Sequence, residues 1–233
     1  MKSVILKYMC VALTAGACTS ESELPEVRVA GKLRDIMHDH DITAKAHLDT
    51  LTSKGLYALG VADSLEGEIT VLNSNVYLSM VRDNVAEVDV ATDVDAALLV
   101  YTYVSNWNEV SPGRDISDII ALNAYLAELQ QSMDISGPMP FLLKGEVNAL
   151  HYHILSNPGQ HASHDELKRT AYRDVMKNSS AEIIGFYSKE HQGVFTHHDT
   201  HIHMHFVSED KKRSGHIDSL TIGDNIQLYI PEL

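Results

Sequence analysis

The chain has 233 residues with 18 Lys and Arg against 32 Asp and Glu, which gives a formal net charge of −14. This acidic balance argues against nucleic acid and anionic membrane surfaces as partners, because both repel an acidic protein. With 44% apolar and 21% charged residues, the composition excludes a disordered chain. The length suits one compact domain or two small ones that share a surface.

The N-terminal segment has the pattern of an export signal. Lys2 and Lys7 precede a short apolar or small-residue run at Tyr8–Ala17, which is too short to span a bilayer as a helix. Small residues directly before Cys18 are similar to a bacterial lipobox. We therefore expect residues 1–17 to be a signal peptide, Cys18 to be the lipidated N-terminus and residues 19–26 to be a tether. The alternative is an ordinary cleaved signal.

Export implies a periplasmic or cell-envelope location, with a lipid anchor as the one route to the membrane. Both cysteines lie at or before position 18, so the mature chain can form no internal disulfide even in an oxidising compartment.

The segment 27–135 is rich in strand patterns. Turn signals at Asp63–Gly67 and Asn73–Asn75 separate successive strands, and the second of them is typical of a hairpin. We expect a short helix at Lys32–His38 and strands at Val27–Val29, Leu56–Val61, Glu68–Leu72, Val76–Val81 and Leu98–Val104. A helix capped by Asp115 or Ser117 should then run to about Met133.

The segment 136–233 begins after the helix-breaking Ser136-Gly137-Pro138. We expect one helix at Asp165–Met176 and strands at Phe141–Leu150, Ile183–Tyr187, Ile202–Val207, His216–Ile222 and Ile226–Ile230. The predicted fold class is α+β and strand-rich, with two sheet-based halves and few helices. A mixed sheet should form the N-terminal half, and an antiparallel, partly open barrel-like sheet the C-terminal half.

Half of the 14 histidines lie between positions 191 and 216. In the segment His201–Val207 histidines alternate with apolar residues, so a strand would direct them all to one face. A polar turn centred on Asp210 and Lys211 follows. A hairpin symmetric about this turn places His205 opposite His216, with His203 two residues along.

Three imidazoles that converge on one hairpin with a fourth position open are typical of a catalytic metal site. His203, His205 and His216 are therefore the predicted ligands, with Zn²⁺ (zinc) as the expected metal and another divalent transition metal as the alternative. His201 lies about 13 Å along the strand from His205, too far to share the ion comfortably.

At these residues the chain resembles the bacterial alpha-acetolactate decarboxylases. The hairpin motif is His203-Met204-His205-Phe206, then Glu209-Asp210, then Gly215-His216. Three further blocks agree in order and spacing: Leu59-Gly60 with Leu65-Glu66-Gly67-Glu68, Pro140-Phe141 with Lys144-Gly145, and Ile184-Gly185-Phe186-Tyr187. The similarity spans roughly residues 26 to 230, and the hairpin is its specific part.

The resemblance implies a carbon–carbon lyase that converts 2-acetolactate to acetoin and carbon dioxide, a step of acetoin biosynthesis and the butanediol pathway. The metal would act as a Lewis acid that stabilises an enediolate, and Glu68 would be the proton donor. The implied partners are a small 2-hydroxy-3-oxo acid and a second copy of the chain in a homodimer.

The chain also departs from the family pattern. His153 stands where the family carries an active-site Arg, and His offers no bidentate fork to a carboxylate. No residue up to Leu233 matches the family's C-terminal Glu. A divergent decarboxylase, an enzyme for a related 2-hydroxy-3-oxo acid and an inactive paralogue therefore stay open. The rival class is an exported zinc-binding or zinc-buffering lipoprotein, which would use His197, His198 and His201 as additional weak ligands.

Overall fold

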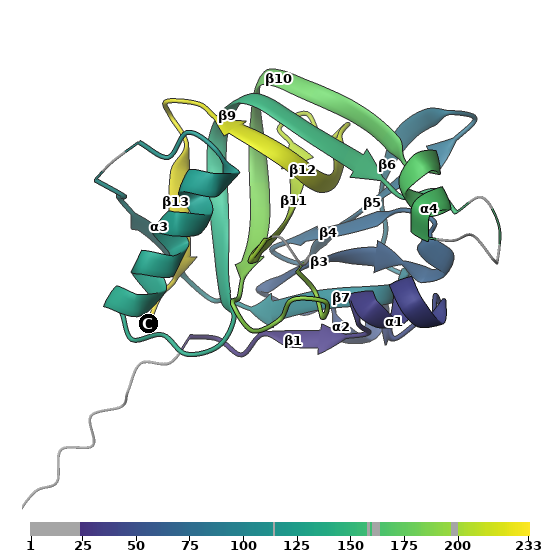
Figure 1. Cartoon of the computed structure of the whole chain (residues 1–233), viewed down its shortest axis with the longest axis horizontal. Helices are drawn as coiled ribbons and strands as arrows, with labels where there is room; N and C mark the ends of the chain where they lie inside the picture. Colours follow the sequence, from purple (N-terminus) through teal and green to yellow (C-terminus); the bar gives the residue numbers. More distant parts are fainter. Residues whose placement is uncertain (1–23, 114, 158, 160–163, 197–199) are drawn as a thin grey trace, which may run out of the picture.

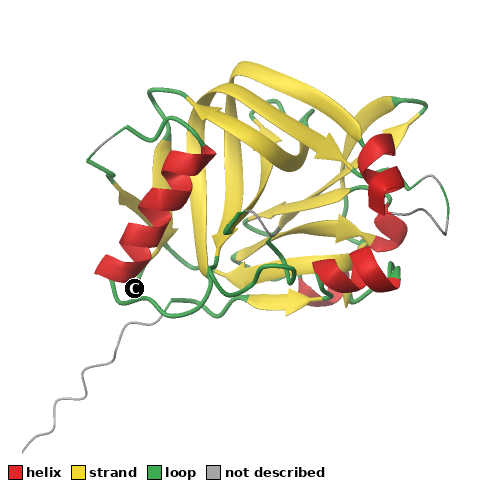
Figure 2. Ribbon diagram, viewed as in Figure 1, coloured by secondary structure: helices red, strands yellow, loops and turns green. Residues whose placement is uncertain are grey.

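The computed structural model describes residues 24–113, 115–157, 159, 164–196 and 200–233. The expected signal peptide, Cys18 and most of the tether lie outside the described residues, as do His197 and His198. The described chain forms two sheets with helices at their margins (Figures 1 and 2). In this part of the chain no helix has the length and apolar character needed to cross a membrane.

The first sheet has the strand order β1-β7-β3-β4-β5-β6, with β2 also paired to β7. Its strands are β1 (Arg28–Ala30), β2 (Ala46–His47), β3 (Leu56–Ala62), β4 (Glu68–Leu72), β5 (Asn75–Arg82), β6 (Val85–Val90) and β7 (Asp95–Tyr103). Every pairing among these described strands is antiparallel, so the expectation of a mixed sheet is corrected. Each strand from β3 to β6 is joined to the next by a short turn, and a short turn brings the chain back antiparallel to the strand before it.

The second sheet contains a closed ring of strands. Strand β9 pairs with both β10 and β12, and β11 joins β10 to β12, while β13 and β8 extend the sheet beyond β9. The strands are β8 (Trp107–Val110), β9 (Met139–Ile154), β10 (Tyr172–Tyr187), β11 (Ile202–Ser208), β12 (Ser214–Ile222) and β13 (Gln227–Pro231). The predicted barrel-like sheet is thus confirmed, and it recruits β8 from before the expected division at 135.

The helices are short apart from one. They are α1 (Leu33–Asp39), α2 (Leu48–Leu51), the 3₁₀ turn η1 (Asp63–Leu65), α3 (Ile119–Ser132) and α4 (His164–Thr170). The cap of α3 is Asp118, which accepts hydrogen bonds from the backbone N–H groups of Ile120 and Ala121 at 3.0 and 2.8 Å. It lies three residues after the predicted cap Asp115 and one after the predicted cap Ser117.

The predicted helix Asp165–Met176 is wrong in its second half. Helix α4 ends at Thr170, and Tyr172–Met176 form the start of β10 in register with the end of β9. Strand β9 provides hydrogen-bond partners for the backbone N–H and C=O groups of this segment. Met176 is buried in the core between the strands instead of lying on a helix face.

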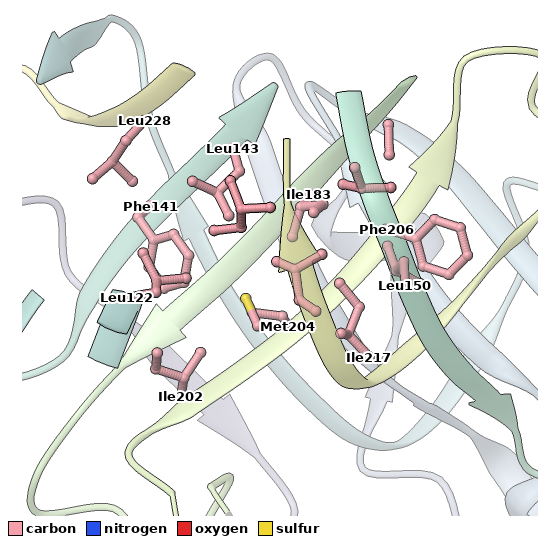
Figure 3. Close-up of a cluster of buried hydrophobic side chains, with 14 of the residues drawn as sticks. Leu122, Phe141, Leu143, Leu150, Ile183, Ile202, Met204, Phe206, Ile217 and Leu228 are labelled. Atoms are coloured by element: carbon pink, nitrogen blue, oxygen red, sulfur yellow. The ribbon is translucent and has the colours of Figure 1, made fainter. Parts of the chain in front are cut away.

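Alternate residues of β9 and β10 serve two different cores. Leu142, Ile184 and Phe186 pack against Leu59 and Val100 of the first sheet, so they bind the two sheets together. Their neighbours point into the ring and toward α3 (Figure 3). Members of this ring core include Leu122, Phe141, Leu143, Leu150, Ile183, Met204, Phe206 and Ile217. Both faces are buried only at 139–143 of β9 and 183–187 of β10, and these two segments are the apolar parts of strands that are otherwise polar and partly exposed.

Helix α3 provides a matched test of this packing. Leu126 is fully buried against the ring core, whereas Ile120 on the same helix is 77% exposed. Leu126→Ala should therefore lower the free energy of unfolding by about 2–5 kcal/mol through lost burial and a cavity. Ile120→Ala should change it by less than about 0.5 kcal/mol. Urea unfolding of both variants measures the difference, and equal effects would contradict the placement of α3.

Candidate metal centre

The β11–β12 hairpin has the predicted register. His205 lies directly opposite His216, and His203 shares their face two residues earlier on β11. The three imidazoles are buried, and one ring nitrogen from each lies within 4.8 Å of the others. Nε2 of His203 is 3.0 Å from Nδ1 of His216. The hairpin thus brings together all three predicted ligands.

His205 is held in the neutral form and in one tautomer. Its Nδ1 lies 2.9 Å from the backbone oxygen of Ile69 on β4, and a carbonyl can only accept, so Nδ1 carries the hydrogen. Nε2 therefore keeps its lone pair, and it has no hydrogen-bond partner among the described residues. Burial lowers the pKa of His205 to about 3, which keeps the ring neutral at physiological pH.

Glu68 faces this histidine from the first sheet. Its side chain is 1% exposed, and Oε2 lies 3.6 Å from Nε2 of His205. Oε1 accepts a hydrogen bond from the backbone N–H of Leu155 at 3.2 Å. Burial raises the pKa of Glu68 well above its ordinary value, although the hydrogen bond from Leu155 opposes the shift. A proton therefore stays on this carboxyl at a pH where a surface Glu has lost it.

The turn before β4 sets the position of Glu68. Gly67 has φ of +126°, and a Cβ there would lie 2.4 Å from the backbone oxygen of Ser79. Only glycine fits this close approach, which allows the chain to leave η1 and enter β4 with Glu68 directed inward.

His153 stands beside Glu68 on β9. Its ring is tilted against His216 with centroids 4.6 Å apart, and its Nε2 is 3.9 Å from Oε1 of Glu68. Its Nδ1 donates to Oδ1 of Asp218 at 2.8 Å. The second oxygen of Asp218 accepts from Nη1 of Arg173, also at 2.8 Å. His153, Asp218 and Arg173 thus form one connected polar chain.

Sequence reasoning missed Arg173 and Asp218. Arg173 fell within the segment predicted as a helix, which concealed that it lies opposite His153 in the β9–β10 ladder. Asp218 lies two residues after the predicted ligand His216, so strand alternation places both on one face, although an irregularity of β12 lies between Ile217 and Ser219. Reading residues 172–176 as a strand would have brought Arg173 into consideration. The two-residue spacing from His216 is the signal that could have identified Asp218.

A cavity of about 340 Å³ opens beside these groups. Its polar wall is formed by Glu68, His153, Arg173, His203, His216 and Asp218. Apolar side chains complete the lining, including Leu33, Ile36, Leu65, Leu98, Leu155 and Leu167. The site can therefore enclose a small polar molecule next to a surface that excludes water.

His201 stays apart from the three-histidine group. Its ring packs against Tyr187 with centroids 6.2 Å apart. Within the described residues, the histidines grouped closely enough to hold an ion with His203 are His205 and His216. A second group, His153, His216 and Asp218, shares one histidine with the first.

The donor set fits a divalent transition metal. Ligands about 2.1 Å from a tetrahedral zinc ion lie about 3.4 Å apart, close to the separation of the His203 and His216 nitrogens. The buried lone pair of His205 Nε2 has no other partner among the described residues, and a metal would supply one. The hydrogen bond from His205 to Ile69 is the orienting contact that metal-binding histidines commonly make.

Fold and site together define an α+β protein of two antiparallel sheets with a buried candidate metal centre where the sheets meet. The model of the alpha-acetolactate decarboxylase family matches residues 30–233, and the chain belongs to this family.

Solved structures agree on the fold. The alpha-acetolactate decarboxylase from Bacillus subtilis strain 168 is similar with a TM-score of 0.70 at 12% identity, over 89% of this chain and 86% of that one. A Staphylococcus aureus protein, described as of unknown function and similar to alpha-acetolactate decarboxylase, gives a TM-score of 0.70 at 14% identity, over 88% of this chain and 84% of that one. A search of curated protein sequences finds no match.

Proposed function

We propose that the protein is a metal-dependent decarboxylase that converts 2-acetolactate, or a closely related 2-hydroxy-3-oxo acid, to the hydroxyketone and carbon dioxide. Membership of the family supports the reaction class. The observation that carries the proposal is the buried carboxyl of Glu68, which lies on the wall of the cavity with Oε2 3.6 Å from Nε2 of the candidate metal ligand His205.

His203, His205 and His216 would hold the metal, with zinc as the expected ion. When bound, it would supply a Lewis acid that stabilises the negative charge developing on the substrate oxygens as carbon dioxide leaves.

The reaction leaves an electron pair on the carbon that loses its carboxylate, and this carbon must then receive a proton. Glu68 is suited to donate it, because burial raises the pKa of this carboxyl and so holds its proton to a higher pH than that of a surface Glu. The Leu155 N–H holds one carboxyl oxygen and leaves the other, Oε2, facing the site. His153 would contact the substrate beside Glu68, since its ring forms the adjacent part of the cavity wall.

A coupled measurement tests this proposal. Purified mature protein should contain about one zinc ion per chain, and it should form acetoin from 2-acetolactate in a reaction that a chelator abolishes and added zinc restores. An authentic decarboxylase assayed in parallel validates the substrate. Bound zinc without turnover of any 2-hydroxy-3-oxo acid would overturn the proposed enzymatic function and favour the alternative, a zinc-binding lipoprotein.

A further inference from the structure

One row of residues crosses the ring from strand to strand. Arg173 on β10 lies opposite His153 on β9, which lies opposite His216 on β12, which in turn lies opposite His205 on β11. Directly opposed residues of antiparallel strands project from the same face with Cβ atoms about 4.5–5.5 Å apart. Arg173 therefore belongs to the same row as two of the candidate metal ligands, two strands from His216.

Asp218 fixes the end of the Arg173 side chain. Its carboxylate bonds Nη1 of Arg173 and Nδ1 of His153, each at 2.8 Å, so the guanidinium is held beside His153. Both Arg173 and Asp218 line the cavity. The Arg173 side chain is 50% exposed and His153 only 14%, so Arg173 stands on the solvent side of the row.

The charges around the cavity favour a role for Arg173 in binding an anion. The carboxylate of Asp218 lines the cavity, and the whole chain has a formal net charge of −14. A negatively charged substrate gains nothing from this field. Among the described residues that line the cavity, Arg173 is the one Lys or Arg side chain. Its planar guanidinium matches the geometry of a carboxylate.

We propose that Arg173 binds the carboxylate of the substrate and selects 2-hydroxy-3-oxo acids over neutral hydroxyketones, with Asp218 as its positioning residue. This inference rests on the proposed function and names the residue that recognises the charged group. The carboxylate is bound before the carbon–carbon bond breaks and leaves as neutral carbon dioxide. The contact with Arg173 therefore stabilises the bound substrate more than the product, and its loss should raise KM more than it lowers kcat.

Kinetics of Arg173 variants test this split. Arg173→Gln should raise KM for 2-acetolactate about 10- to 100-fold, the effect of one charge-assisted contact, with kcat changed less than about threefold. Arg173→Lys should recover part of the loss. Arg169→Gln is the matched control, because Arg169 is an exposed residue of α4 whose side chain pairs with Glu166 on the same helix. Unchanged KM in Arg173→Gln, with metal content and Tm as in the unaltered protein, would overturn the inference.

Asp218→Asn separates positioning from direct contact. It keeps the shape of the side chain but removes the charge that holds Arg173, so KM should rise less than in Arg173→Gln. The double variant should raise KM by less than the product of the two single effects, because both substitutions remove the same Arg173–Asp218 contact. Fully additive effects would contradict a shared role.

Calorimetry with two unreactive probes distinguishes this inference from the proposed function. Zinc-loaded protein is titrated with the anion 2-hydroxy-2-methylpropanoate and, separately, with neutral acetoin. Arg173→Gln should weaken binding of the anion at least 10-fold and leave acetoin within about twofold. If Arg173→Gln weakens binding of the anion alone, but the unaltered protein turns over no 2-hydroxy-3-oxo acid, the proposed function fails and the role of Arg173 stands. Equal effects on both probes would overturn the role of Arg173, whatever the turnover.

Discussion

His203→Ala is expected to reduce bound zinc from about one ion per chain to almost none, and to abolish chelator-sensitive acetoin formation with it. Its imidazole is buried with a nitrogen 3.0 Å from His216, so its removal takes away one of the three converging donors. A zinc ion held by two remaining histidines would exchange rapidly during purification. Metal analysis of the dialysed protein measures the loss.

His201→Ala is the control for this loss. His201 lies on the same stretch of chain, but its ring contacts Tyr187 and is not grouped with the other three. The variant should keep its zinc and its turnover. Equal metal loss in both variants would contradict the ligand assignment and indicate that the whole histidine-rich segment binds zinc loosely. Circular dichroism should show that both variants are folded.

Glu68→Gln is expected to keep its zinc and to lose about 10²- to 10⁴-fold in kcat, the range for removal of a general acid. The amide has the size of the carboxyl, and its oxygen can still accept the hydrogen bond from Leu155. It has no acidic proton to give to the carbon. Glu66→Gln is the matched control, because Glu66 is two residues away and exposed.

The pH dependence of the rate, compared between the unaltered protein and Glu68→Gln, is a second test of the role of Glu68. The pKa of Glu68 is raised, so its proton is fully present at low pH and is lost as the pH rises through that raised value. The rate of the unaltered protein should therefore decline on the alkaline side, and the residual rate of Glu68→Gln should lack this limb. Loss of zinc in Glu68→Gln would instead make Glu68 a ligand and contradict its role as proton donor.

The β11–β12 hairpin could be predicted from sequence down to its register. Strict alternation fixes which face each residue occupies, and a short polar turn leaves little freedom in pairing, so His205 and His216 could be set opposite each other. The role of Glu68 was accessible only through the family resemblance. Its burial depends on the contact between β4 and Leu155, which are far apart in the sequence.

Non-local pairing explains what could not be predicted. Residues Tyr172–Met176 are strand because β9 lies beside them, and local patterns suggested a continuation of α4. Strand β6 lies at the edge of its sheet with mostly exposed or half-buried residues, so it lacks the apolar run that marks a buried strand. The pairing of β9 with β10 is what brings Arg173 to the site, and no window of sequence contains both strands.

The candidate centre is shared between the two sheets. Ile69 and Thr70 of β4 contact His205 and Ser214 of the second sheet, next to Glu68. The three candidate ligands lie on one hairpin of the second sheet, but the carbonyl that orients His205 and the carboxyl of Glu68 come from the first sheet, so the centre is complete only when folding has joined the two. Because an unfolded chain has no such arrangement, a bound ion would stabilise the docked pair as one cooperative unit, by about 4 kcal/mol at a free concentration 1,000 times its Kd. Metal affinity would then depend on the contact between the sheets as well as on the hairpin, and a substitution deep in the sheet interface would weaken it without touching a ligand.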